Sequence, residues 1–360
     1  MKRGILAGAV ALLVSSSLGG GGSSTPAAET TSPTPDGEDA GDGGGSPGPD
    51  GGPADGGADG PTLPSVPDSI EVIVEPTDKA QALLSAVQGA KSSIHMTMYL
   101  LSDKRFISAL VAQRAAGRDV KVVLNQTFPG GAGTNQNAFN DLKAGGVSVV
   151  WAPSSFTLTH EKCVMIDGAQ AWIMTMNLAT TSPENREYLA LDREAADVAE
   201  AEAMFAADFA NTPFIPNGSL LVAPVNARTK LLTLIQSATK SVDLEGEELS
   251  DTKIVSALIA AKKAGAAVRV VLADNAPTPA QTSSVNQLKA AGIPVVSVGT
   301  PYIHAKAIVV DGAGAYVGSE NFTTASLQYN RELGIITTKA ASVSAVGTAI
   351  RQDFAAGSPL

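Results

Sequence analysis

The stretch "AVQGAKSSIHMTMYLLSDKRFISALVAQRAAGRDVKVVLN" (residues 86–125) recurs as "LIQSATKSVDLEGEELSDTKIVSALIAAKKAGAAVRVVLA" (residues 234–273), so the chain repeats itself. Asp103 and Asp251 occupy equivalent places in the two copies, 148 residues apart. Further along, "NDLKAGGVSVV" aligns with "NQLKAAGIPVV". A unit of about 145 residues is much longer than the repeats of solenoid proteins and indicates a duplicated domain.

Within each unit, β-branched runs alternate with helical patterns. The runs "SIHMTMYL" (93–100), "VKVVL" (120–124) and "VSVVWA" (147–152) predict strands, and "FISALVAQRAAG" (106–117) predicts an amphipathic helix. Nearly continuous apolar strands are typical of sheets that are buried on both faces. We therefore predict an α/β fold of two pseudo-symmetric α/β/α sandwich domains with mixed, mainly parallel sheets. A site is expected at their junction.

The first residues, "MKRGILAGAVALLVSSSLGGGG", have two bases followed by a short apolar run and small residues. This pattern predicts a signal peptide over residues 1–19, and an uncleaved membrane anchor is the alternative. Residues 20–64 are rich in Gly, Pro and Asp and predict a disordered linker. The two domains are then expected at 65–212 and 213–360. Export implies a secreted, periplasmic or cell-envelope protein.

The formal charge of -10 at pH 7 is unevenly distributed over the 360 residues. Eight of the 35 acidic residues lie within residues 20–60, which contain no Lys or Arg. Residues 61–360 hold the other 27 acids and 23 bases, a net charge of -4. This mild excess argues only weakly against an anionic substrate. No stripe of Lys and Arg indicates a groove for a nucleic-acid backbone, so nucleic acid is disfavoured as a partner.

Two of the three histidines lie in the same pattern, His-x-Lys-x-x-x-x-Asp. The pattern occurs in "LTHEKCVMIDGAQAWIMTMNL" (158–178) and in "YIHAKAIVVDGAGAYVGSENF" (302–322). Its members are His160, Lys162 and Asp167 in the first copy and His304, Lys306 and Asp311 in the second. Downstream, Thr175 and Asn177 match Ser319 and Asn321, and "NRE" recurs at 185–187 and 330–332. Scarce polar residues are therefore repeated together with the apolar positions of the scaffold.

The spacing of this motif has a physical reason. Residues i and i+2 of a strand face the same side, so each imidazole lies beside an ammonium group. Such a pair suits a phosphate, because cations hold its oxygens while one histidine attacks phosphorus and the other protonates the leaving oxygen. An imidazole nucleophile also needs a carboxylate at its far nitrogen. Glu187 and Glu332, 27 and 28 residues beyond the histidines of their own halves, are expected to supply it. Glu332 is thus assigned to His304.

The ligand sets of metal sites are not evident in the sequence. We find no cluster of carboxylates and no Cys/His set with the spacing of a metal site. The predicted chemistry therefore uses neither a metal ion nor another cofactor.

The two motifs resemble the signature of the phospholipase D superfamily, and the resemblance covers roughly residues 69–356. It implies a phosphodiesterase or transphosphatidylase that works through a covalent phosphohistidine, with both motifs at one interdomain site. By this resemblance His160 is the nucleophile and His304 the general acid and then base, although the residues alone leave the reverse assignment open. Lys162, Lys306, Asn177 and Asn321 would bind phosphate.

The resemblance also assigns supporting roles. Ser319 and Thr175 would belong to the substrate-binding turn, whereas Asp167 and Asp311 would hold strand ends rather than take part in catalysis. The first copy departs from the second at Met174, which stands where the second has Gly318, so its turn is expected to be less tight.

Other polar and aromatic residues receive weaker predictions. Cys163 lies in an apolar run and is expected to be a buried, inert thiol. His95 aligns with Asp243, so a core or cleft-wall histidine is favoured there. Solvent-exposed acids and half-buried aromatic residues are the default for two further groups, with contact to the substrate as the alternative. These groups are Glu245, Glu247 and Glu248, and Trp151, Phe156 and Tyr302.

Three functions remain open at this point. The first is an exported phospholipase D-like enzyme that hydrolyses or transfers the phosphodiester of a phospholipid, with transient contact to a membrane surface. The second is a metal-independent nuclease of the same superfamily. The third is a catalytically silent surface-binding module, for which a broken motif would be expected. A monomer is predicted because both motifs lie in one chain.

Overall fold

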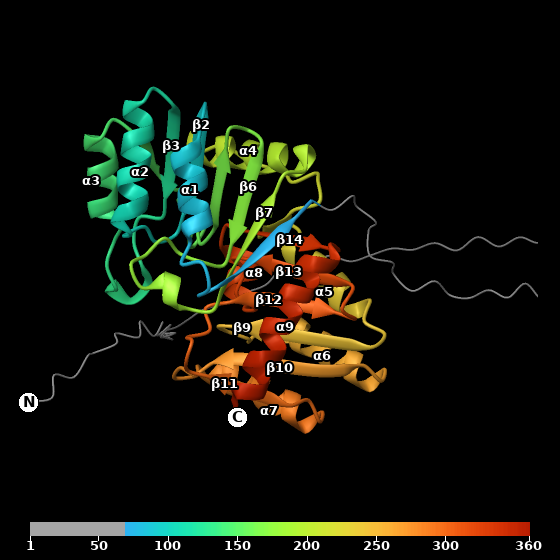
Figure 1. Ribbon diagram of the computed structural model, residues 1–360. Helices are drawn as coiled ribbons and strands as arrows, with labels where there is room; N and C mark the ends of the chain where they lie inside the picture. Colours follow the sequence, from blue (N-terminus) through green and yellow to red (C-terminus); the bar gives the residue numbers. More distant parts are fainter. Residues whose placement is uncertain (1–68) are drawn as a thin grey trace, which may run out of the picture. The chain divides into compact units, whose positions relative to one another are not determined.

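Each half of the repeat forms one mixed β-sheet covered by helices, as a computed structural model shows (Figure 1). The structure describes residues 69–360, so the predicted signal segment (1–19) and the whole predicted linker (20–64) lie outside the described residues. The described residues belong to one compact unit. The predicted α/β fold with two pseudo-symmetric halves is confirmed.

The first sheet has seven strands in the order β1-β7-β6-β5-β2-β3-β4. Its strands are β1 (Glu71–Glu75), β2 (Ser93–Met98), β3 (Asp119–Leu124), β4 (Ser148–Trp151), β5 (Lys162–Ile166), β6 (Gln170–Met174) and β7 (Glu187–Asp192). Strands β2, β3 and β4 run parallel, and all other neighbours in the sheet are antiparallel. The first histidine motif therefore enters the middle of the sheet at β5.

The second sheet has eight strands in the order β15-β11-β10-β9-β12-β13-β14-β8. Its strands are β8 (Leu221–Ala223), β9 (Ser241–Gly246), β10 (Ala267–Ala273), β11 (Val295–Val298), β12 (Lys306–Val310), β13 (Gly314–Gly318), β14 (Glu332–Thr337) and β15 (Ser358–Pro359). Strands β9, β10 and β11 run parallel, as their equivalents do in the first sheet. The second motif enters at β12, the equivalent of β5.

The expectation that the sheets are mainly parallel needs correction, because most neighbouring strands in both sheets are antiparallel. Continuous apolar character reports burial on both faces and not the direction of the strands. In this fold the antiparallel strands β5 and β12 are as fully buried as the parallel ones, because helices or the other half cover both of their faces.

Helices cover the sheets on both faces. They are α1 (Gln81–Gly89), α2 (Lys104–Ala115), α3 (Gln136–Ala144) and α4 (Ala195–Ala210) in the first half, and α5 (Ala227–Gln236), α6 (Thr252–Lys263), α7 (Pro279–Ala290), α8 (Thr324–Tyr329) and α9 (Ala340–Ala356) in the second. Helices α1–α3 and α5–α8 lie on the outer faces, and α4 and α9 lie on the faces where the halves join. Asp103 and Asp251 cap the equivalent helices α2 and α6 by accepting backbone N–H groups. Within residues 69–360, no helix has both the length and the apolar character needed to cross a membrane.

The two sheets share a core. Leu83, Phe106 and Leu142 of α1–α3 pack on one face of the first sheet, and helices α5–α7 cover the second sheet in the same way. A third cluster joins the halves, since it contains Phe205 of α4 and Val346 of α9 together with residues of both sheets. This shared core holds β5 and β12 in a common frame.

Asp167 and Asp311 lie at the ends of β5 and β12, away from the histidines that begin the motifs. Both have positive φ, 57° and 54°. Asp167 accepts the backbone N–H groups of residues 91–93, and Asp311 accepts those of residues 239–241. Each carboxylate therefore ties a strand turn to the segment before the neighbouring strand, which fits the structural role expected for it.

Candidate active site

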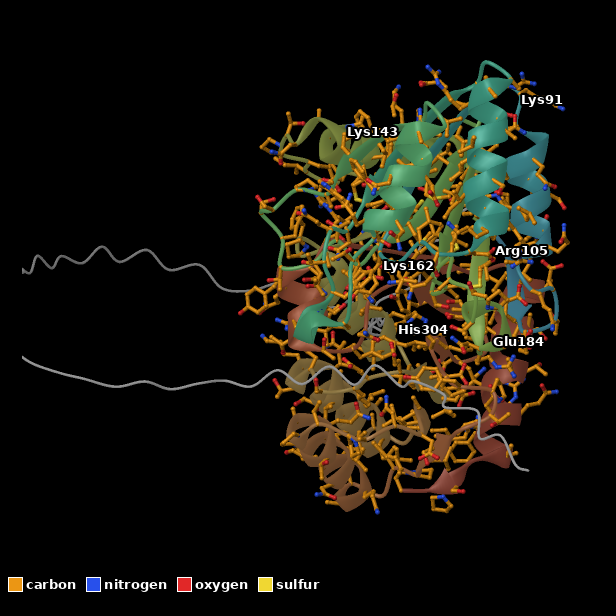
Figure 2. The ribbon with its side chains drawn as sticks, turned by 90° about the vertical axis from the view of Figure 1, so that its left-hand side faces the viewer. Lys91, Arg105, Lys143, Lys162, Glu184 and His304 are labelled. Atoms are coloured by element: carbon orange, nitrogen blue, oxygen red, sulfur yellow. The ribbon has the colours of Figure 1, made fainter. Side chains whose placement is uncertain are left out.

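The two histidine motifs meet where the halves join. His160 precedes β5 and His304 precedes β12, and only 8% and 9% of their surfaces are exposed. Figure 2 labels Lys162 and His304, which lie where the green elements of the first half meet the brown elements of the second. The site therefore lies between the two halves, as predicted.

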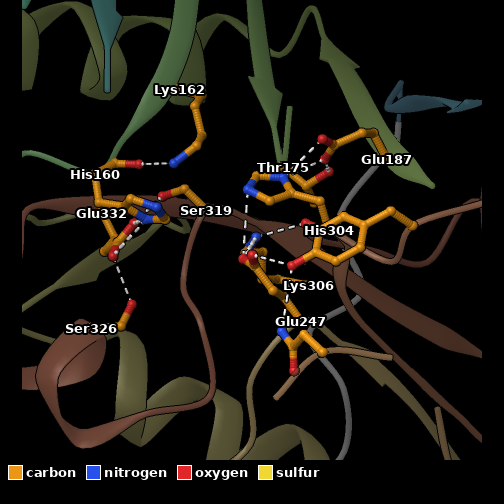
Figure 3. Close-up of polar contacts among 12 residues, drawn as sticks. His160, Lys162, Thr175, Glu187, Glu247, His304, Lys306, Ser319, Ser326 and Glu332 are labelled. Atoms are coloured by element: carbon orange, nitrogen blue, oxygen red, sulfur yellow. Dashed lines mark hydrogen bonds and ion pairs between the residues drawn. The ribbon is translucent and has the colours of Figure 1, made fainter. Parts of the chain in front are cut away.

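Each histidine is held by a carboxylate of the other half. His160 Nδ1 lies 2.9 Å from Glu332 Oε2, and His304 Nδ1 lies 2.8 Å from Glu187 Oε1 (Figure 3). The prediction that each glutamate orients the histidine of its own half, with Glu332 on His304, is therefore wrong. Both carboxylates remain at the far nitrogen of an imidazole, so Nε2 of each ring is directed away from them.

The backbone explains the exchange of partners. The residue before each glutamate forms an isolated parallel bridge with the segment before the other half's histidine, Arg331 with Thr159 and Arg186 with Ile303. As a result His160 N–H donates to the carbonyl of Arg331 at 2.9 Å, and His304 N–H donates to that of Arg186 at 3.2 Å. The next residue in each strand is the glutamate, which thereby reaches the imidazole.

The side chains of these two arginines form ion pairs across the same junction between the halves. Arg331 pairs with Asp208 of α4 at 2.8 Å, and Arg186 pairs with Asp353 of α9 at 2.6 Å. The sequence analysis did not assign a role to either arginine. The recurring "NRE" was the available signal, because it repeats the arginine together with the glutamate.

Hydroxyl groups donate hydrogen bonds to the two carboxylates. Ser319 Oγ donates to Glu332 at 2.6 Å, and Thr175 Oγ1 donates to Glu187 at 2.5 Å. Both hydroxyls are fully buried, and each also accepts a backbone N–H. The substrate-binding role predicted for Ser319 and Thr175 is corrected on this geometry, because their hydroxyls are engaged in fixing the glutamates. Ser326 Oγ, which the sequence analysis missed, adds a second donor to Glu332 at 2.6 Å.

The two lysines of the motifs are fully buried beside the histidines. Lys162 Nζ donates to the carbonyl of His160, and Lys306 Nζ donates to that of His304 at 2.6 Å. Lys306 also donates to Glu247 Oε2 at 2.9 Å. Two buried ammonium groups next to two imidazoles form a site suited to an anion such as a phosphodiester.

The electrostatics of His160 and Lys162 follow from burial. Burial above all, together with the charges of Lys162 and Lys306, lowers the pKa of His160 to about 4, although Glu332 opposes this. Burial likewise lowers the pKa of Lys162 to about 7. Burial would raise the pKa of Glu332, but His160, Lys162 and Ser319 reverse this and hold it below its usual value. At neutral pH the site thus contains an uncharged His160 on an ionised Glu332.

Asn177 and Asn321 follow β6 and β13 and are half-buried. Their Oδ1 atoms are buried and find no hydrogen-bond partner among residues 69–360. Phosphate oxygens accept hydrogen bonds, so the Nδ2 groups and not these Oδ1 atoms would bind them, and the phosphate-binding role of the two amides remains a prediction.

The structural reason for Gly318 differs from the tight turn that was predicted. A Cβ atom there would lie 2.6 Å from the backbone of Gly334 on β14 and would crowd the hydrogen bond between Tyr316 and Glu320. In the first half the equivalent space is filled by apolar residues, among them Met174 and Leu189. The glycine therefore makes room for a buried polar pair and does not mark a tighter turn.

Several other residues considered for the site lie outside the polar network of His160 and His304. His95 pairs with Glu202 at 2.6 Å and stacks on Phe205, whereas Trp151 stacks on Phe139. Cys163 is buried, and burial raises the pKa of its thiol well above the usual value. The remaining residues are Glu245, which accepts from Tyr188, and Phe156, which packs on Arg331.

Glu247 and Tyr302 do reach the site. Tyr302 Oη donates to Glu247 Oε1 at 3.0 Å, and Glu247 Oε2 lies 3.5 Å from His304 Nε2. Glu248 is half-buried close by, and burial together with the charge of Glu247 raises its pKa to about 7. The solvent-exposed default is therefore wrong for Glu245, which is fully buried, and for Glu247, which contacts Lys306 and His304, whereas contact with the substrate remains a prediction.

Comparison with known proteins gives a consistent picture. The family described as "Cardiolipin synthase, PLD-like domain" matches residues 83–209 and again 231–354. The major cardiolipin synthase ClsA of Bacillus subtilis is 25% identical over 320 residues, 74% of this chain. The chain spans 64% of the length of that relative. The minor cardiolipin synthase ClsB of the same organism is 22% identical, with 79% of this chain and 81% of the relative covered.

Solved structures agree on the fold. Phosphatidylserine synthase from Haemophilus influenzae superimposes with a TM-score of 0.62 at 11% identity, covering 81% of this chain and 87% of that one. Polyphosphate kinase from Porphyromonas gingivalis gives a TM-score of 0.61 at 16% identity, covering 80% and 48%. At these identities the likeness concerns the fold alone.

Proposed function

We propose a function from the premise that this chain belongs to the PLD-like domain family of cardiolipin synthases and so to the phospholipase D superfamily. The proposal is that the chain transfers a phosphatidyl group from one alcohol to another. The observation that carries the proposal is the reciprocal pairing of His160 with Glu332 and of His304 with Glu187 between two buried lysines. In both imidazoles a glutamate occupies Nδ1, which would leave Nε2 to take part in chemistry at one phosphorus atom.

In the first step His160 Nε2 attacks phosphorus, and the bond from phosphorus to the headgroup alcohol breaks. The alcohol oxygen takes its proton from His304 Nε2 as it leaves. The low pKa of His160 supports its role as the nucleophile, because a neutral imidazole keeps its lone pair at neutral pH. Glu187 at Nδ1 and Glu247 near Nε2 fix the orientation of His304, to which the role of general acid is assigned.

In the second step the phosphorus–nitrogen bond breaks as a new alcohol attacks from the side of His304. His304, which is now neutral, takes the proton of that alcohol, and His160 returns to its starting state. Lys162 and Lys306 would hold the phosphate oxygens through both steps. Water in place of the alcohol would give hydrolysis. The sequence left hydrolysis and transfer open, and we favour transfer because the relatives named above are synthases.

The test uses vesicles of phosphatidylglycerol with the purified chain and a chelator. We expect release of glycerol and formation of a diphosphatidyl product in wild type, lost by a factor of at least about 10³ in His160→Asn and His304→Asn. His95→Asn is the matched control, because it replaces the third histidine outside the site. With substrate labelled at phosphorus, wild type quenched during turnover should carry acid-labile, alkali-stable label on the protein, and His160→Asn should not.

Other outcomes would assign another function. Phosphatidic acid as the sole lipid product would make the chain a hydrolase. Nicking of plasmid DNA without any reaction on lipid would overturn the proposal in favour of a nuclease, and inertness of the wild type on both substrates would favour a binding module.

We also propose that the chain is exported, contacts its lipid at a membrane surface and acts as a monomer. The N-terminal pattern of residues 1–19 and the presence of both motifs in one chain support these points. Cell fractionation, with sequencing of the mature N-terminus, tests the first, and light scattering of the purified chain tests the last.

A further inference from the structure

The two halves of the site differ at one pair of equivalent positions, Tyr99 and Glu247, which are 148 residues apart in the repeat. In the first half the ring of Tyr99 lies against His160, with centroids 4.5 Å apart, and 4.9 Å from Lys162 Nζ. In the second half the same place holds a carboxylate on Lys306 and near His304 (Figure 3). The repeat therefore offers an apolar wall to one histidine and an acceptor to the other.

The carboxylate of Glu247 is fixed and ionised. Tyr302 Oη donates to its Oε1, and Tyr302 in turn lies 3.4 Å from the amide of Asn275. Burial would raise the pKa of Glu247, but Lys306 and His304 outweigh it and hold the pKa far below the usual value. Its side chain is 19% exposed, whereas that of Lys306 is fully covered. Glu247 thus stands on the more accessible side of the lysine.

A carboxylate at this point is unfavourable for the phosphate itself, because like charges repel. It is favourable for a group that donates hydrogen bonds, and hydrogen bonds to charged acceptors are the stronger ones. In the proposed reaction, the atom that meets His304 Nε2 is the oxygen of the leaving or entering alcohol. Glu247 therefore neighbours the alcohol in both steps and not the diacylglycerol portion.

We propose that Glu247 determines which alcohol the enzyme releases and accepts, by accepting a hydrogen bond from a donor group on the carbon next to the one that bears the reacting oxygen. This inference rests on the transfer reaction proposed above. A hydroxyl of a glycerol-type diol and the ammonium of an ethanolamine-type alcohol share this donor chemistry. An alcohol of the same length that lacks the donor cannot form this additional hydrogen bond to the carboxylate and is disfavoured.

The experiment offers pairs of soluble alcohols to the enzyme in one reaction on phosphatidylglycerol vesicles and measures the ratio of the phosphatidyl-alcohol products. We expect wild type to favour 1,2-propanediol and ethanolamine over 1-propanol by about tenfold to a hundredfold. Glu247→Leu should bring both ratios close to one. Glu247→Gln keeps an acceptor but not the charge, so the preference for ethanolamine should fall more than that for the diol. Glu71→Gln, an exposed acid at the start of β1 and outside both motifs, is the control.

A ratio measured within one sample does not depend on the folded fraction of a variant, so partial unfolding does not imitate the effect. Unchanged ratios in Glu247→Leu would overturn the inference while leaving the transfer reaction intact. Equal use of 1-propanol and the donor-bearing alcohols by wild type would do the same. Absence of any phosphatidyl transfer or phosphatidic acid release from wild type would instead refute the proposed function on which the inference rests.

Discussion

Glu332 Oε2 lies 2.9 Å from His160 Nδ1, although 172 residues separate the two in the chain and each belongs to a different copy of the repeat. In the equivalent contact, Glu187 of the first half pairs with His304 of the second. Neither half has a complete site by itself, because each depends on the other for the carboxylate that orients its imidazole. A duplicated chain therefore contains one site built from two half-sites.

This reciprocity predicts the pattern of energetic coupling. In a double-mutant cycle by urea unfolding, His160→Ala and Glu332→Ala should show an interaction free energy of about 1–3 kcal/mol, because they share a buried contact. The cycle of His304→Ala with Glu332→Ala is the control and should be additive within about 0.5 kcal/mol. A larger coupling in the second cycle than in the first would restore the pairing within each half.

The pKa of His160 predicts how stability depends on pH. Its value is about 4 in the folded chain, against about 6.5 in an unfolded one. Between these values only the unfolded state binds the proton, so His160 costs stability progressively as the pH falls from 6.5 to 4, up to about 3 kcal/mol. His160→Asn should therefore show a shallower loss of unfolding free energy over this interval.

His95 supplies a control of opposite sign. Burial lowers its pKa, but contacts with Glu202 and Asp119 outweigh this and leave the pKa raised. Its contribution to stability is fully present below about pH 6.5 and is lost as the pH rises through the folded pKa. His95→Asn should accordingly cost more stability at pH 5.5 than at pH 8. Parallel pH profiles for the two variants would contradict both assignments.

Lys162 predicts an alkaline limit to activity. Because burial lowers its pKa to about 7, the ammonium that would hold phosphate is lost in the free enzyme above that pH. A plot of kcat/KM against pH should fall with an apparent pKa near 7, while kcat, which reports the occupied enzyme, should fall at higher pH. Lys162→Met should be much less active and lack this alkaline limb. Persistence of the limb in that variant would assign it to another group.

Gly318 predicts a steric penalty that the repeat alone does not indicate. A methyl group there would overlap Gly334 and the Tyr316–Glu320 pair, so Gly318→Ala should lower the free energy of unfolding by about 1–3 kcal/mol. Gly89→Ala is the matched control, because a Cβ at the end of α1 meets nothing within 4 Å. The control should be neutral or slightly stabilising in the same urea titration. Equal effects of both substitutions would argue against close packing at Gly318.

The elements of the fold were predictable because their signals are local. The run at residues 93–100 became β2, and the helix expected to end at Gly117 became α2, with Asp103 as its cap. Strand direction was not predictable, because apolar periodicity is the same in parallel and antiparallel strands that are buried on both faces. The sheet order that places the antiparallel β5 beside β2 depends on long-range pairing.

The repeat in the sequence is enough to show that two equivalent half-sites exist, since the histidine, lysine, asparagine and glutamate recur together in a repeated frame. Tertiary structure alone decided that Glu332 serves His160, because the bridge between Arg331 and Thr159 joins segments whose separation in the chain carries no signal. It likewise decided that Tyr99 and Glu247, which differ in residue type at equivalent positions of the repeat, lie beside the two histidines. Residue type and spacing record what a site contains, whereas the contact between the halves sets which groups touch.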